Sequence, residues 1–169
     1  MRILVTNDDG INAKGIKLLS SWAKSIGDVT VCAPMGQQSG KSQSLSLNQK
    51  FIVRKVEYEG IDNAYCVDST PADCVRFAFD VLGYFDLVLS GVNYGYNIGD
   101  DISYSGTCGA MFDAICWKAK GIAFSVSFNT FDSFEKHMDS VWKCFVENSL
   151  LDKCPLWNVN FPDEAKGIS

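Results

Sequence analysis

The chain has 169 residues and a formal net charge of −5, with 47% hydrophobic and 21% charged residues. This length and balance predict one globular domain, residues 1–169, with a substantial buried core. The acidic charge and the absence of a Lys/Arg-rich run argue against a nucleic-acid duplex as the partner, because duplex binding begins with phosphate neutralisation.

Cysteine and histidine usage narrows the chemistry further. Seven cysteines occur without a Cys-x-x-Cys pair, and the first apolar run, Arg2–Val5, is too short for a signal peptide or a membrane span. We therefore expect reduced thiols in a cytoplasmic protein that does not bind membranes. The single histidine, His137, falls in a stretch with a helical pattern. This placement argues against Ser-His-Asp or Cys-His catalysis and against zinc sites built from several imidazoles.

Strand and helix patterns alternate along most of the chain. Strands are predicted over residues 2–5, 29–33, 64–67, 85–89, 122–126 and 156–161, and further strands within 45–56. Helices are predicted over residues 13–26, 71–82, 107–120 and 134–148, and a long loop over 91–106. This order predicts an α/β fold with a mainly parallel sheet and helices on both faces. Thr70 and Pro71 suit the cap and first position of the second helix, so that stretch needs only a structural explanation.

The first predicted strand ends in Asn7-Asp8-Asp9-Gly10. Two adjacent carboxylates repel each other unless a cation lies between them, and a hard divalent metal is the usual solution. The same residues are also good turn formers, so this segment alone would indicate no more than a turn.

Three polar loops are expected at one edge of a parallel sheet, and they carry Asp8 and Asp9, then Ser39, then Asn93. Carboxylate, hydroxyl and amide oxygens suit Mg or Mn, with water in the remaining positions. We expect one such ion, which would lower the pKa of a bound water and stabilise charge on a phosphoryl oxygen. Asp8 or the bound water is the candidate for handling protons.

The second half of the site is predicted at Ser105-Gly106-Thr107, where a helix follows a glycine. The free backbone N–H groups of such a helix start attract phosphate, although Ser105 or Thr107 could equally be a simple helix cap. We also place Asn7 and Asn97 among the candidate substrate-binding residues.

Several motifs occur together in the order Ile3–Gly10, Thr70–Val75, Ser90–Asn93 with Asn97 and Gly99, and Tyr104–Thr107. In this combination the chain resembles the SurE family of stationary-phase survival proteins, which are metal-dependent nucleotidases. The resemblance implies a Rossmann-like, three-layer α/β domain and a divalent ion held at Asp8, Asp9, Ser39 and Asn93, with Asp8 and Asp9 catalytic. It implies hydrolysis of nucleoside 5′-monophosphates, and of 3′-monophosphates or short polyphosphate in some members.

Members of this family continue beyond the strand equivalent to residues 156–161. Their additional C-terminal segment contributes to dimer formation and to the rim of the active site. Since this chain ends at Ser169, we expect it to lack that extension. The resemblance implies a homodimer or tetramer, which would be weakened without the segment.

Two alternatives remain open at this point. A phosphoreceiver signalling domain also places an acidic pair after its first strand and binds Mg. It would need an Asp and a Lys at later strand ends, where this chain has Ser90–Asn93 and Ser125–Ser127. The second alternative is a catalytically impaired, nucleotide-binding fragment, if the C-terminal segment is required for turnover.

Overall fold

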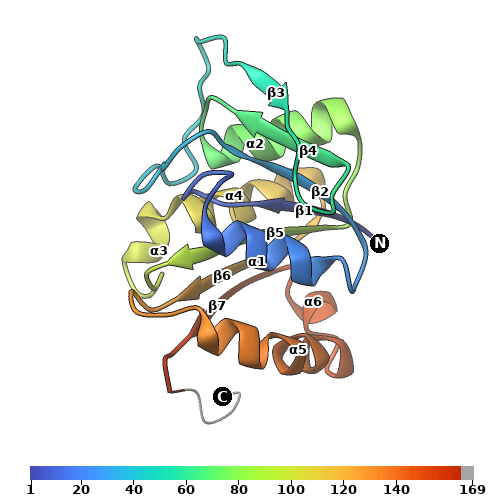
Figure 1. Cartoon of the computed structure of the whole chain (residues 1–169), viewed down its shortest axis with the longest axis vertical. Coiled ribbons are helices and arrows are strands. Elements are labelled where there is room, and N and C mark those ends of the chain that lie inside the picture. Colours follow the sequence, from blue (N-terminus) through green and yellow to red (C-terminus); the bar gives the residue numbers. More distant parts are fainter. Residues whose placement is uncertain (165–169) are drawn as a thin grey trace.

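A seven-stranded sheet runs through the centre of the computed structural model, which describes residues 1–164 (Figure 1). The strands lie in the order β3-β4-β2-β1-β5-β6-β7, and every described pair is parallel except β3 with β4. Their bounds are β1 Arg2–Thr6, β2 Asp28–Pro34, β3 Val53–Lys55, β4 Asn63–Val67, β5 Leu87–Tyr94, β6 Lys120–Val126 and β7 Leu156–Phe161. The predicted α/β fold with a mainly parallel sheet is confirmed.

Helices cover both faces of the sheet, which gives three layers. One face packs against α1 (Lys14–Ala23) and α5 (Asp132–Glu147), and the other against α2 (Pro71–Phe77) and α4 (Gly106–Ala114). The remaining helical segments are η1 Ala78–Leu82, α3 Asp101–Tyr104, η2 Ile115–Trp117 and α6 Leu150–Lys153. Among residues 1–164, no helix combines the length and apolar character needed to cross a membrane.

The central strand β1 shows why the sheet is covered on both sides. Ile3 and Val5 lie in the core beneath α1 and α5, whereas Leu4 lies in the core beneath α2 and α4. All three side chains are fully buried. Successive residues of a strand point to opposite faces, so an uninterrupted apolar run requires a helix layer on each side.

Several predicted boundaries are wrong, and the largest differences fall between residues 41 and 106. No strand forms at residues 45–47: Leu47 is 82% exposed, and pairing begins only at Val53. The expected loop 91–106 is interrupted, because β5 continues to Tyr94 and α3 forms further on. The helix predicted over 107–120 ends at Ala114, and after η2 the chain turns at Lys118, whose φ is 58°. Contacts with distant segments, described next, outweigh the local alternation of residues 45–47.

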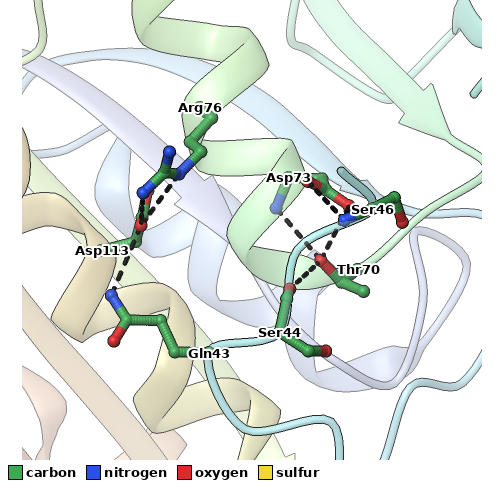
Figure 2. Close-up of polar contacts among 7 residues, drawn as sticks. All are labelled: Gln43, Ser44, Ser46, Thr70, Asp73, Arg76 and Asp113. Atoms are coloured by element: carbon green, nitrogen blue, oxygen red, sulfur yellow. Dashed lines mark hydrogen bonds and ion pairs between the residues drawn. The ribbon is translucent and has the colours of Figure 1, made fainter. Parts of the chain in front are cut away.

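Side chains of α2 and α4 hold the segment 43–46 in place (Figure 2). The Thr70 hydroxyl donates to the Ser44 carbonyl oxygen at 2.7 Å, and the Ser46 N–H donates to Asp73 Oδ2 at 3.1 Å. Gln43 Nε2 donates to Asp113 Oδ1 at 3.4 Å.

The predicted cap is confirmed, because Thr70 Oγ1 accepts from the Asp73 N–H at 3.2 Å. The same two residues also position the loop that follows Ser39, so the structural role of this helix start extends beyond the helix itself. Asp113 in turn forms an ion pair with Arg76, with 3.2 Å between Oδ1 and Nη2. The start of α2 therefore fixes part of the rim of the sheet.

Replacing Asp73 should loosen this loop. Asp73→Ala removes the acceptor of the Ser46 N–H and of the Ser69 hydroxyl, so we expect faster amide hydrogen exchange over residues 43–46. Stability should fall by about 1–3 kcal/mol in urea unfolding, since the buried Ser69 hydroxyl and the partly buried Ser46 N–H lose their acceptor.

Asp80→Ala is the matched control, because Asp80 lies in η1 of the same helical segment but is exposed. Unchanged exchange over residues 43–46 in Asp73→Ala would show that the loop does not depend on this carboxylate.

Candidate active site

The candidate site lies where the order of the parallel strands reverses. β2 and β5 both pair with β1, and the chain proceeds outward from β1 in both directions. Loops that leave the carboxyl ends of such strands diverge and form a crevice that binds ligands. The loop after β1 carries Asp8 and Asp9, and the end of β5 carries Asn93. The tertiary structure thus places these residues at the expected edge of the sheet.

Asp8 is buried against the start of α4, with 3% of its surface exposed. Its Oδ1 accepts a hydrogen bond from the Thr107 hydroxyl at 2.5 Å. A Cβ atom at Gly106 would lie 2.8 Å from the Cβ of Asp8, so only glycine permits this approach. Burial raises the pKa of Asp8, while the Thr107 hydroxyl and the N–H groups of this helix start act in the opposite direction.

Asp9 points toward a different set of groups. It is partly buried, and its Oδ2 accepts from the Tyr94 N–H at 3.4 Å. Burial, and secondarily the neighbouring charge of Asp8, raise the pKa of Asp9 to about 6. Within residues 1–164, neither carboxylate forms an ion pair with a Lys or Arg side chain. Two adjacent, partly desolvated carboxylates with no protein cation fit the requirements of a divalent ion.

The other two predicted metal ligands are placed less directly. The Gln38 N–H donates to the Asp8 carbonyl oxygen at 2.6 Å, which brings the loop of Ser39 to the site. The Ser39 side chain itself is exposed and accepts from Gln37 Nε2 at 3.2 Å. Asn93 is partly buried, and its Nδ2 donates to the Gly95 carbonyl oxygen at 2.6 Å, so its Oδ1 is the atom available to a ligand.

Asn7 and Asn97 take part in hydrogen bonds that shape the loops. Asn7 closes the acidic turn, since its Nδ2 donates to the Gly10 carbonyl oxygen at 2.9 Å and its Oδ1 accepts from the Gly10 N–H at 3.2 Å. Asn97 is buried, and its Nδ2 donates to Ser125 Oγ at 3.0 Å. A substrate contact by either residue stays a prediction.

The start of α4 shows which of its two hydroxyl side chains caps the helix. Ser105 is the cap, because its Oγ accepts from the Cys108 N–H at 3.1 Å. Thr107 is not the cap, and its hydroxyl is directed to Asp8. The helix start and the acidic pair therefore form one continuous site, with Gly106 between them.

Sequence reasoning missed a pocket on the other side of Asp9. It measures about 560 Å³ and includes Lys14, Tyr94 and Phe131 in its lining. The only local sequence signal for this pocket was that Tyr94 directly follows Asn93, one of the predicted metal ligands. Phe131 follows β6 and reaches the site only through the pairing of β5 with β6.

Comparisons with known proteins agree with this fold. A family model described as Survival protein SurE matches residues 3–169. The chain is 41% identical over 169 residues to the 5′-nucleotidase SurE of Vibrio vulnificus (strain YJ016). This alignment covers 96% of this chain and 64% of the relative. It is 44% identical over 130 residues to the 5′-nucleotidase SurE of Clostridium botulinum (strain Kyoto / Type A2). That alignment covers 76% of this chain and 52% of the relative. The chain thus spans about two thirds or less of the length of these relatives.

A solved structure gives the same result. The crystal structure of SurE protein from Aquifex aeolicus superposes with a TM-score of 0.84 at 35% identity, covering 100% of this chain and 71% of that chain. The family match over nearly the whole sequence and the shared fold confirm the resemblance inferred from the motifs. The chain belongs to the SurE family of survival proteins.

Proposed function

We propose that the chain is a metal-dependent phosphatase that hydrolyses nucleoside 5′-monophosphates to nucleoside and phosphate. The observation that carries the proposal is the adjacent pair of carboxylates, in which Asp8 is buried against the start of α4 and Asp9 is partly buried. The relatives named 5′-nucleotidase SurE support the same activity. 3′-Monophosphates and short polyphosphate present the same terminal phosphoryl group and belong in the same assay.

Asp8, Asp9, Asn93 and Ser39 are the residues that would hold one Mg or Mn ion. When bound, such an ion supplies a water of lowered pKa and neutralises charge on a phosphoryl oxygen. Both carboxylates are held in place by the protein, Asp8 by the Thr107 hydroxyl and Asp9 by the Tyr94 N–H. Ser39 would have to exchange its contact with Gln37 for the ion.

The start of α4 is suited to the phosphate. This helix has nine residues, and the N–H groups of Gly106 and Thr107 act on the Asp8 carboxylate, so they face the site. The positive end of the helix dipole and these donors would stabilise negative charge that develops on the phosphoryl group. We assign Asp8 as the proton acceptor, with a transient nucleophile as the alternative role, because the single histidine lies on α5.

Two alternatives can be weighed against this proposal. Membership of the SurE family argues against the phosphoreceiver domain. A catalytically impaired fragment would bind nucleotide without releasing phosphate, so a hydrolysis assay separates it from an active enzyme. The homodimer or tetramer stays a prediction, which light scattering of this chain tests.

The acidic pair should bind a divalent cation. Addition of Mn or Mg should raise the melting temperature, since an ion that binds only the folded state stabilises it. Asp8→Asn and Asp9→Asn should each remove most of this shift. Asp28→Asn is the control and should retain it, because Asp28 is exposed at the start of β2, at the opposite edge of the sheet. A full shift in the Asp8→Asn/Asp9→Asn double variant would refute the assignment of the ligands.

Hydrolysis should depend on the same residues. We expect phosphate release from nucleoside 5′-monophosphates with Mn or Mg present, and its loss when EDTA is added. Asp8→Asn should lower kcat by about 10²–10⁴-fold, the usual effect of removing a positioned proton acceptor. Single-turnover hydrolysis in ¹⁸O-labelled water tests the alternative role of Asp8, because label in its carboxylate would show that Asp8 had acted as a nucleophile. Activity that survives EDTA would contradict the mechanism.

A further inference from the structure

The pocket beside Asp9 is separate from the start of α4. Six of its lining residues are Asp9, Lys14, Gln37, Tyr94, Asn129 and Phe131. Asp8 faces Thr107 on the α4 side, whereas Asp9 borders the pocket beside the first turn of α1. A ligand that contacts the acidic pair can therefore extend into the pocket while its phosphate remains at α4.

One wall of this pocket is aromatic and partly exposed. The Tyr94 ring stacks on Phe131, with 5.4 Å between the ring centroids and 27° between the planes. The Phe128 and Tyr94 rings form a T-shaped pair with 5.8 Å between their centroids. Tyr94 nevertheless remains 41% exposed, and Phe128 contacts it from outside the pocket lining. Aromatic rings that are exposed beside a candidate catalytic site can stack with a planar ligand.

The wall is fixed before any ligand binds. The Tyr94 hydroxyl donates to the Phe128 carbonyl oxygen at 2.6 Å, and the Gly95 N–H donates to the Val126 carbonyl oxygen at 3.0 Å. A Cβ atom at Gly95 would lie 2.5 Å from the Phe128 ring, so glycine permits the close contact. A surface already in its binding conformation loses less entropy when a ligand binds.

The rest of the lining is polar and complements the non-phosphate part of a nucleotide. The Lys14 ammonium lies 5.2 Å from the centroid of the Phe131 ring and gives the pocket lining a positive charge. Gln37 and Asn129 supply amides that can pair with ribose hydroxyls or base edges. The pocket thus combines an aromatic wall with hydrogen-bonding groups, as expected for a small-molecule site.

We propose that this pocket binds the nucleoside part of the substrate, with the base stacked on the aromatic wall led by Tyr94. The proposal rests on the proposed phosphatase function and deepens it, because it assigns base recognition to residues outside the acidic pair. Tyr94 connects the two parts of the site, because its N–H contacts Asp9 and the residue also lines the pocket. Stacking is tolerant of base identity, so we expect a preference for nucleotides over sugar phosphates with little choice among bases.

The test compares a substrate with a base and one without. For adenosine 5′-monophosphate relative to ribose 5-phosphate, Tyr94→Leu should lower the ratio of kcat/KM values about tenfold, within the usual range for loss of base stacking. The change should lie mainly in KM for the nucleotide. Tyr94→Phe keeps the ring and should retain most of the ratio, although it loses the hydrogen bond to Phe128.

Tyr84→Leu is the matched control. Tyr84 is 53% exposed, packs its edge on Phe79 at 6.0 Å, and donates its hydroxyl to the Lys118 carbonyl oxygen at 3.4 Å. It thus resembles Tyr94 in exposure and contacts but does not line the pocket. In Tyr84→Leu, the ratio of kcat/KM values for the two substrates should equal that of the unaltered chain. An unchanged ratio in Tyr94→Leu, or an equal fall in both variants, would overturn the proposal.

Calorimetric titration with adenosine distinguishes failure of this proposal from failure of the proposed function. If the unaltered chain binds adenosine and Tyr94→Leu weakens binding about tenfold, the pocket is supported even when no phosphate is released. If adenosine does not bind, or binds both chains equally, the pocket assignment is wrong whatever the phosphatase assay shows.

Discussion

The proximity of two carboxylates at the end of the central strand is the constraint on which the candidate site depends. Burial raises the pKa of both Asp8 and Asp9, and the neighbouring charge of Asp8 raises the pKa of Asp9 further, so ionisation of the pair is costly. The protein reduces this cost only in part, through the Thr107 hydroxyl and the Tyr94 N–H. A divalent cation would balance the remaining charge, and no Lys or Arg in the described chain forms an ion pair with either carboxylate.

Close backbone contacts build the rim around these carboxylates. A Cβ atom at Gly15 would lie 1.9 Å from the Val92 carbonyl oxygen, and one at Gly109 would lie 2.0 Å from that of Ser42. Helices α1 and α4 can therefore approach the strand end and the loop after β2 more closely than a side chain would allow. The loop is held from the other side by α2 (Figure 2), so three helices define the geometry of one edge of the sheet.

The reversal of strand order gives the site two sides with different chemistry. Asp8 meets the start of α4, where backbone donors and the helix dipole suit a phosphate. Asp9 meets a pocket whose aromatic wall suits a base. Because the helices of a doubly wound sheet lie on opposite faces, adjacent residues of one turn can serve both sides. This arrangement supports the proposed nucleotide substrate more fully than the acidic pair does by itself.

The sequence by itself determined the alternation of strands and helices and the position of the acidic pair, because strands buried on both faces are continuous apolar runs that end at polar turns. It also identified Asn93 as a residue of the same rim. Only the tertiary structure decided which way the loops turn. Residues 45–47 alternate like a strand, yet Ser46 pairs with Asp73, which is 27 positions away. The pocket likewise unites segments from β1, β5 and the chain after β6, and no local pattern encodes contacts that arise only when these strands pair.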